Sequence, residues 1–156
     1  MVNAGLTGDT TGGMLARFRD DVVSQQATHV FVMGGANDIF LSGEIGTAKA
    51  NLGAILYQGL SGGMIPVIGL PTPIHPMVAD SPWGKLFDYT QAAAKMEELC
   101  RWLIQFTSAF GISIVDFRTV FGVPPDQSYY IDGLHASVLG HQKMARHFLE
   151  AIFPGK

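Results

Sequence analysis

The stretch THVFVMGGAND, residues 28–38, joins two kinds of local structure. Its first half, Thr28–Met33, is a nearly continuous run of apolar and β-branched residues, which is typical of a strand buried on both faces of a sheet. Its second half, Gly34–Asp38, is a glycine-rich turn of the kind that separates a strand from a helix. The stretch therefore predicts a buried strand followed at once by a turn and a helix.

The same alternation recurs along the chain. Two further runs, Met64–Leu70 and Ile112–Phe117, are apolar and β-branched, and Met1–Ala4 is a candidate for the tail of an earlier strand. Strands that alternate with helices indicate βαβ units and a parallel sheet, so we expect residues 1–156 to form a single α/β domain. Mostly apolar residues at helical spacing lie around the strands: Leu15, Phe18 and Val22; Ala48, Leu52, Ile55 and Gly59; positions 86, 89, 93, 96, 100, 103, 107 and 110, a stripe broken only by Thr107; and Val138, Ala145, Phe148, Leu149 and Ile152, with Ser137 as an expected N-cap.

Composition limits the classes of function. The chain is 47% hydrophobic and 15% charged, which is typical of a globular domain. Its formal net charge is −3 and no Lys/Arg cluster stands out, so we expect no nucleic-acid partner. The apolar runs are too short for a membrane-spanning segment. Cys100 is the single cysteine, which excludes an internal disulfide and a cysteine-based zinc site, and we expect it to pack in the core.

Polar motifs follow each of the three expected strands. Gly34–Asp38 follows the first, Pro71–Pro76 follows the second, and Tyr129–His135 follows the third. In open α/β sheets, ligands bind beyond the carboxyl ends of the strands, where such segments meet. The sequence therefore predicts one site at this edge, with His75 as a candidate pocket residue.

The tetrapeptide DGLH places Asp132 and His135 three residues apart, just before an expected helix. In a catalytic interpretation, Asp132 accepts a hydrogen bond from one imidazole nitrogen and leaves the other nitrogen free to act as a base. In the alternative interpretation, the tetrapeptide is an ordinary turn at a helix N-terminus. Both interpretations remain open at this point.

Two glycine-containing turns are candidate anion-binding elements. In GGAND, the side-chain amide of Asn37 is a candidate donor to a developing oxyanion; alternatively, Asn37 or Asp38 caps a helix. The loop Gly5–Gly13 lacks the lysine of a phosphate-binding loop and does not fit the dinucleotide pattern. Its Gly8 N–H is a candidate second oxyanion donor.

Taken together, NAGLTGDTT (residues 3–11), GGANDI and DGLH resemble the SGNH (GDSL-type) esterase and lipase family over essentially the whole chain. The resemblance implies a flavodoxin-like three-layer α/β/α sandwich around a five-stranded parallel sheet. It implies hydrolysis of small-molecule, lipid or carbohydrate acyl esters and of thioesters, with no metal or organic cofactor. It also implies that His135 is the base, that Asp132 orients it, and that Gly8 and Asn37 belong to the oxyanion hole.

The resemblance also implies a missing element. The second block of the family reads Asn-x-x-x-x-Gly-Asp-Thr, which Asn3–Thr10 fits, and Gly8 precedes Asn37 by 37 − 8 = 29 residues, close to the family spacing. Gly8-Asp9-Thr10 is therefore the second block, and the Gly-Asp-Ser block with the nucleophile belongs upstream. We expect this domain to be N-terminally incomplete by one strand–helix unit, on the order of 30 residues.

The function, the association state and the compartment of the chain remain open in the sequence. The chain is the larger part of a serine hydrolase, or a pseudoenzyme or binding module that kept the pocket, or an enzyme that uses Thr10 or Thr11 as nucleophile. A sheet without its first strand leaves a neighbouring strand unpaired, so we expect aggregation, a homodimer formed through that edge, or marginal stability. The compartment is cytoplasmic if Met1 is the true start and secreted if an upstream segment carries a leader.

Overall fold

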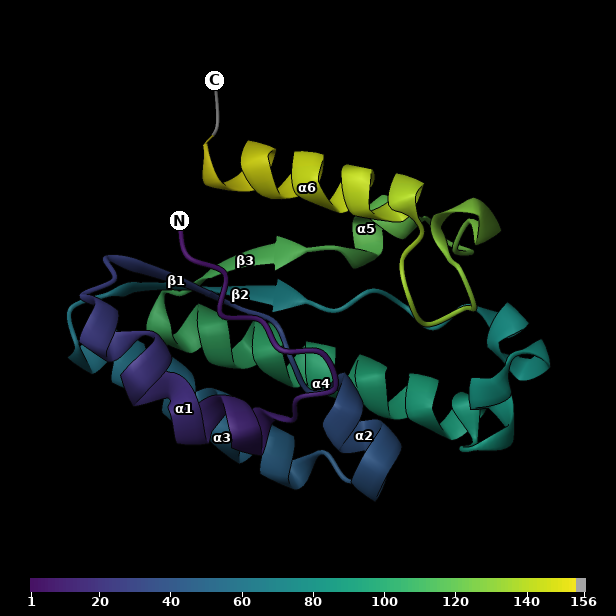
Figure 1. Cartoon of the computed structure of the whole chain (residues 1–156), viewed down its shortest axis with the longest axis horizontal. Helices are drawn as coiled ribbons and strands as arrows, with labels where there is room; N and C mark the ends of the chain where they lie inside the picture. Colours follow the sequence, from purple (N-terminus) through teal and green to yellow (C-terminus); the bar gives the residue numbers. More distant parts are fainter. Residues whose placement is uncertain (154–156) are drawn as a thin grey trace.

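The computed structural model describes residues 1–153. A parallel sheet of three strands lies between two layers of helices, as the sequence predicted for an α/β sandwich (Figure 1). The strand order is β1-β2-β3, with His29 opposite Ile65 and Val67 opposite Ser113. The strands are β1 (His29–Val32), β2 (Ile65–Leu70) and β3 (Ser113–Asp116), one within each of the three apolar runs.

Helices cover the two faces of the sheet unequally. One face is covered by α1, α3 and α4, and the other carries α6 with the short α5 (Figure 1). The α-helices are α1 (Thr11–Asp21), α2 (Ala36–Ser42), α3 (Gly46–Ser61), α4 (Tyr89–Phe110), α5 (Arg118–Phe121) and α6 (Val138–Ile152). Short 3-10 turns are η1 (Val23–Gln25), η2 (Pro76–Asp80), η3 (Pro82–Lys85) and η4 (Gln127–Tyr129).

Side chains of short polar residues define where the helices begin. The hydroxyl of Thr10 accepts a hydrogen bond from the N–H of Gly13 at the start of α1, and Ser137 caps α6 as predicted. Asp88 caps α4, so this helix begins at Tyr89 rather than at Leu86, where the predicted apolar stripe starts. Leu86 lies before the cap and is exposed.

The main core lies between the sheet and the layer of α1, α3 and α4. It contains Val30 and Val32 of β1 together with Leu52, Leu99 and Leu103. A smaller cluster on the opposite face packs Val67, Val115 and Phe117 against α6. Thr107, the polar break in the α4 stripe, is fully buried, and its hydroxyl donates a hydrogen bond to the carbonyl oxygen of Leu103 at 2.7 Å.

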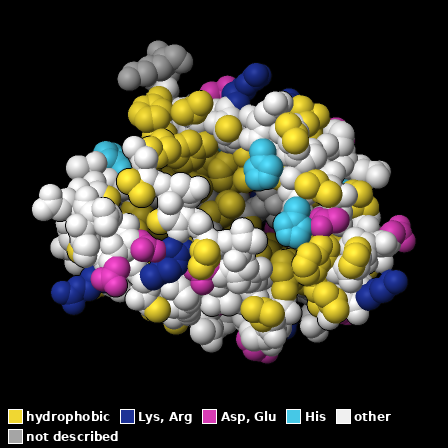
Figure 2. All heavy atoms as spheres, viewed as in Figure 1, with side chains coloured by type: hydrophobic (Ala, Val, Ile, Leu, Met, Phe, Trp, Pro, Cys, Tyr) yellow, Lys and Arg dark blue, Asp and Glu magenta, His cyan; other side chains and the backbone are white. Residues whose placement is uncertain are grey.

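The prediction that the first strand is buried on both faces was wrong. Residues of β1 alternate: Val30 and Val32 are buried, whereas His29 is exposed and Phe31 keeps 39% of its surface exposed. The helix α6 packs against β3, and its Phe148 reaches the ring of Phe31 with centroids 5.0 Å apart, so the face of β1 is covered only in part. Figure 2 shows a hollow lined by hydrophobic side chains on the viewed face.

The segment Met1–Ala4 forms no strand, so its assignment as the tail of an earlier strand was also wrong. Within residues 1–153 this segment pairs with no strand, the edge of β1 stays open, and the sheet has three strands rather than the five that the resemblance implied. The guanidinium of Arg17 holds the segment instead, because its Nη1 donates a hydrogen bond to the carbonyl oxygen of Ala4 at 2.6 Å.

Candidate active site

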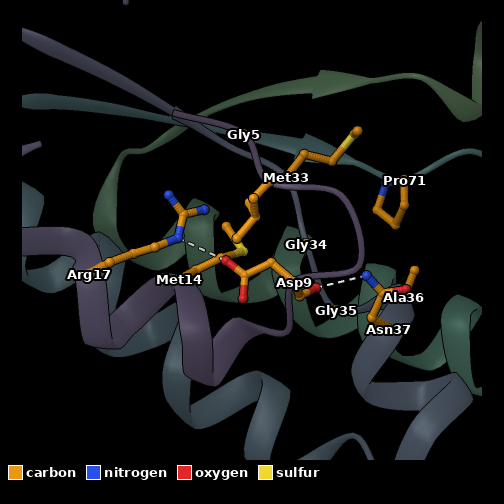
Figure 3. Close-up of a pocket in the computed structure, with 11 residues that line it drawn as sticks. Gly5, Asp9, Met14, Arg17, Met33, Gly34, Gly35, Ala36, Asn37 and Pro71 are labelled. Carbon is orange, nitrogen blue, oxygen red and sulfur yellow. Dashed lines mark hydrogen bonds and ion pairs between the residues drawn. The ribbon is translucent and has the colours of Figure 1, made fainter. Parts of the chain in front are cut away.

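The first half of the site joins the loop before α1 to the turn after β1. Asn37 stands in the first turn of α2, and its Nδ2 donates a hydrogen bond to the carbonyl oxygen of Asp9 at 2.7 Å (Figure 3). Gly8 precedes Asp9 with a φ of 77°, and Gly35 caps α2 with a φ of 106°. Both values lie in the left-handed region that favours glycine, which explains why these turns contain it.

An ion-pair network holds the loop before α1. The carboxylate of Asp9 accepts a hydrogen bond from Nε of Arg17 at 2.8 Å, as Figure 3 shows, and the same guanidinium pairs with Asp21. The hydrogen bonds to Asp21 and Asp9 raise the pKa of Arg17 above its ordinary value. Arg17 therefore fixes the loop that carries Gly8 to the body of α1.

Asp38 braces the turn from inside the protein and is not exposed on the surface of the turn. Its buried carboxylate accepts hydrogen bonds from the N–H of Thr11 at 2.9 Å and from the Thr11 hydroxyl at 2.6 Å. Asn51 in turn donates to that hydroxyl at 3.1 Å. Thr11 is fully buried, and its hydroxyl donates a hydrogen bond to Asp38. The structure therefore contradicts the hypothesis that Thr11 is a nucleophile.

The second half of the site is the Asp132–His135 pair. Nδ1 of His135 lies 2.8 Å from Oδ2 of Asp132, and the imidazole is exposed. Oδ1 of Asp132 accepts the N–H groups of Leu134 at 3.0 Å and His135 at 2.8 Å. The turn therefore brings the two predicted residues into the hydrogen-bonded geometry of a catalytic acid–base pair.

The carboxylate of Asp132 has a second side-chain partner that the sequence did not suggest. Nε1 of Trp83, in η3, donates a hydrogen bond to Oδ2 at 2.8 Å. Burial raises the pKa of Asp132, but hydrogen bonds from His135, Leu134 and Trp83 outweigh it and lower the value to about 2. The pair therefore keeps a charged acceptor next to His135 throughout the neutral range.

The loop after β2 is tied to the turn that carries the pair. The hydroxyl of Tyr130 donates to the carbonyl oxygen of Pro73 at 2.7 Å, and the N–H of His75 donates to the carbonyl oxygen of Gly133 at 2.9 Å. The imidazole of His75 caps η2 by accepting the N–H of Met77 at 3.0 Å. His75 therefore stands beside the pair, as a bracing residue of the loop.

The structure thus places the predicted site residues in two pairs at one edge of the sheet. Asn37 and Gly8 adjoin Asp9 beyond the end of β1, and Asp132 and His135 lie in the segment after β3. No hydrogen bond within residues 1–153 joins one pair to the other. Asn37 of the first pair borders a hollow of about 220 Å³, whose lining also includes Gly5, Leu6, Asp9, Met14, Arg17, Met33 and Pro71.

Other predicted residues lie away from this edge. Cys100 is fully buried on α4, and burial raises the pKa of its thiol to about 11, so it packs in the core as expected. Within residues 1–153, no three His, Cys, Asp or Glu side chains group as metal ligands do. Over the same residues, no helix has the length and apolar character to cross a membrane.

Comparison with known proteins identifies the family. The structure is similar to a GDSL-like lipase from Bacteroides thetaiotaomicron VPI-5482, with a TM-score of 0.82 and 21% identity over 97% of this chain and 74% of that one. It is also similar to a catalytic mutant of an acetylxylan esterase from Geobacillus stearothermophilus, with a TM-score of 0.79 and 23% identity over 97% and 71%.

At these identities, the structural likeness establishes the fold alone. Comparison with curated protein sequences gives no match. A family model, that of the GDSL-like Lipase/Acylhydrolase family, matches residues 1–143 and so takes in both halves of the candidate site. The chain belongs to the GDSL-like lipase/acylhydrolase family.

Proposed function

We propose that this chain carries the base and the oxyanion-binding groups of a serine ester hydrolase. The observation that carries the proposal is the hydrogen bond between Nδ1 of His135 and Oδ2 of Asp132 at 2.8 Å. With Nδ1–H donating to the carboxylate, Nε2 is left unprotonated and takes the proton of an attacking hydroxyl. The negative charge of Asp132 stabilises the imidazolium that forms.

Gly8 and Asn37 supply donors to the oxyanion of the tetrahedral intermediate. An amide nitrogen carries two hydrogens, and the bond from Asn37 to Asp9 uses one of them. The second hydrogen and the Gly8 N–H are the two donors that we assign to the oxyanion. Each such donor is typically worth about 3 kcal/mol of transition-state stabilisation.

The nucleophilic serine belongs, in this proposal, to a strand that pairs with the open edge of β1. Three features of the chain support this: β1 ends the sheet, Phe31 and Met33 are partly exposed, and a hollow lies beside Met33. The hydroxyl groups of Ser81 and Ser137 are used inside the protein, by the carbonyl oxygens of Val78 and Ser128. The alternative function, a binding module that keeps the pocket without the nucleophile, rests on the same features.

A fusion experiment tests the proposal. The purified chain is compared with a fusion that places a Gly-Asp-Ser strand–helix unit before Met1, on a short activated acetyl ester and on acetylated xylan, the ester for which the Geobacillus relative is named. We expect turnover by the fusion alone, abolished by His135→Ala. Turnover by the unfused chain that His135→Ala abolishes would overturn the serine assignment in favour of Thr10. A folded fusion without turnover would favour the binding module.

A further inference from the structure

We propose that Trp83 is a positioning residue for the Asp132–His135 pair, because its indole N–H locks the carboxylate with Oδ2 facing the imidazole. The inference rests on the proposed role of His135 as the base. It adds Trp83 to the Asp132–His135 pair, from a different loop and 49 positions before Asp132 in the sequence.

The hydrogen bonds around Asp132 leave its carboxylate one orientation. Oδ1 accepts two backbone N–H groups, those of Leu134 and His135. Oδ2 accepts two side-chain donors at 2.8 Å, Nε1 of Trp83 and Nδ1 of His135. An ionised carboxylate has about four acceptor sites, so these four donors fill it. Without the Trp83 bond, one site on Oδ2 opens to water and the carboxylate gains freedom to rotate.

Indole suits this position because its N–H donates and never accepts. A hydroxyl in the same place can turn its hydrogen toward another acceptor, and an imidazole can present its unprotonated nitrogen, whereas indole always presents a donor to the ionised carboxylate. The Trp83 ring also lies beside the His135 ring, with centroids 5.5 Å apart and planes at 55°. One side chain therefore fixes the acceptor and restricts the imidazole.

The loop that carries Trp83 is itself fixed. The backbone N–H of Trp83 donates to the hydroxyl of Ser81, and that hydroxyl donates to the carbonyl oxygen of Val78. Gly84 packs against backbone so closely that a Cβ there would lie 2.5 Å from the carbonyl oxygen of Val78. The adjoining bond from His75 to Gly133 ties this loop to the turn of the pair. Trp83 and Asp132 are therefore held on two mutually braced segments.

The test removes the N–H and keeps an aromatic ring. Trp83→Phe is compared with Trp102→Phe, a matched change at the other tryptophan, which lies on α4 and stacks on Phe106. The readout is the pair of ring ¹⁵N chemical shifts of His135 in the chain as it stands, at a pH where the imidazole is neutral. We expect Trp83→Phe to move His135 from a dominant Nδ1–H tautomer to a mixture, and Trp102→Phe to leave it unchanged.

The reciprocal change gives a second, independent readout. Asp132→Asn removes the charged acceptor, so we expect the indole N–H signal of Trp83 to move upfield and that of Trp102 to stay. Backbone amide spectra verify that each variant is folded. Unchanged His135 shifts in a folded Trp83→Phe, or an unmoved Trp83 indole signal in Asp132→Asn, would overturn the proposal. These spectra require no catalysis, so a fusion without turnover would count against the proposed function and not against this inference.

Where the fusion is active, Trp83→Phe has a kinetic signature. We expect about a tenfold lower kcat with little change in KM, because an oriented base matters in the transition state more than in substrate binding. A rise in KM with an unchanged kcat would instead identify Trp83 as a substrate-binding residue and contradict its positioning role.

Discussion

The side-chain amide of Asn37 is bound to the carbonyl oxygen of Asp9, the residue that follows Gly8, at 2.7 Å. This bond connects the turn after β1 to the loop before α1 and sets the two proposed oxyanion donors next to each other. Because Asp9 itself is held by Arg17, neither donor depends on bound substrate for its place. A donor fixed in advance is the arrangement that stabilises a transition state most effectively.

Loss of the Asn37 amide is expected to affect the chemical step. In an active fusion, Asn37→Ala lowers kcat by roughly 10²–10³ and leaves KM nearly unchanged, because the donor acts on charge that develops in the transition state. Steady-state kinetics on an acetyl ester measures this. Asn51→Ala, at an asparagine whose amide donates to the Thr11 hydroxyl, is the control with kcat retained. A higher KM with full kcat in Asn37→Ala would make Asn37 a substrate-binding residue.

Loss of the Asp38 carboxylate is expected to affect stability. Asp38→Ala leaves the N–H and hydroxyl of buried Thr11 without their acceptor, which costs about 2–4 kcal/mol of unfolding free energy for two such bonds. Urea denaturation of the chain measures this cost. Asp20→Ala, at an exposed carboxylate on α1, is expected to change stability little. Equal stability of the two variants would refute the bracing role of Asp38.

The Asp132–His135 pair is expected to make stability depend on acid pH. The pKa of Asp132 is lowered to about 2 in the folded chain, below its ordinary value of about 3.9. Its stabilising contribution is therefore full above pH of about 4 and is lost as the pH falls toward 2. Urea midpoints at several pH values measure the effect. We expect Asp132→Asn to flatten this part of the profile, and an unchanged profile would contradict the assignment.

The partly covered face of β1, at the open edge of the sheet, is expected to drive association. Phe31 and Met33 expose apolar surface beside the open edge of β1, so the chain is expected to bind a hydrophobic dye and to self-associate. Phe31→Ser should reduce both, as measured by dye fluorescence and light scattering. Phe110→Ser, at an exposed phenylalanine at the end of α4, is the control. A stable monomer that binds no dye would refute this prediction.

Local sequence patterns predicted the strands and helices themselves better than how helices cover the strands. All three strands lie within runs that β-branched and apolar composition marked, and Ser137 caps α6 as its residue type indicated. The interpretation of β1 as buried on both faces was wrong because its composition does not reveal which helices cover it. The sequence pattern placed Leu86 on the helix because the apolar spacing begins before Asp88. The helix itself begins only after the hydrogen-bonded cap that Asp88 forms.

In the candidate site, too, contacts between residues close in sequence were predicted, and contacts made by the folding of distant segments were missed. Asp132 and His135 were predicted because they lie three positions apart, so a single turn brings them together. Trp83 was missed because only the folding of the loop after β2 places it against Asp132. The bond from Arg17 to Ala4 was missed for a related reason, since a helix residue that holds a preceding backbone carbonyl has no spacing signature.

Arg17 also bears on the order in which the site is assembled. Its single guanidinium reaches the backbone at Ala4 and the side chains of Asp9 and Asp21, so part of what shapes the loop around Gly8 lies within residues 4–21. These contacts involve no strand paired with β1. A serine-bearing segment that packs against β1, from the same chain or from another molecule, would meet a Gly8 loop that is already held in place.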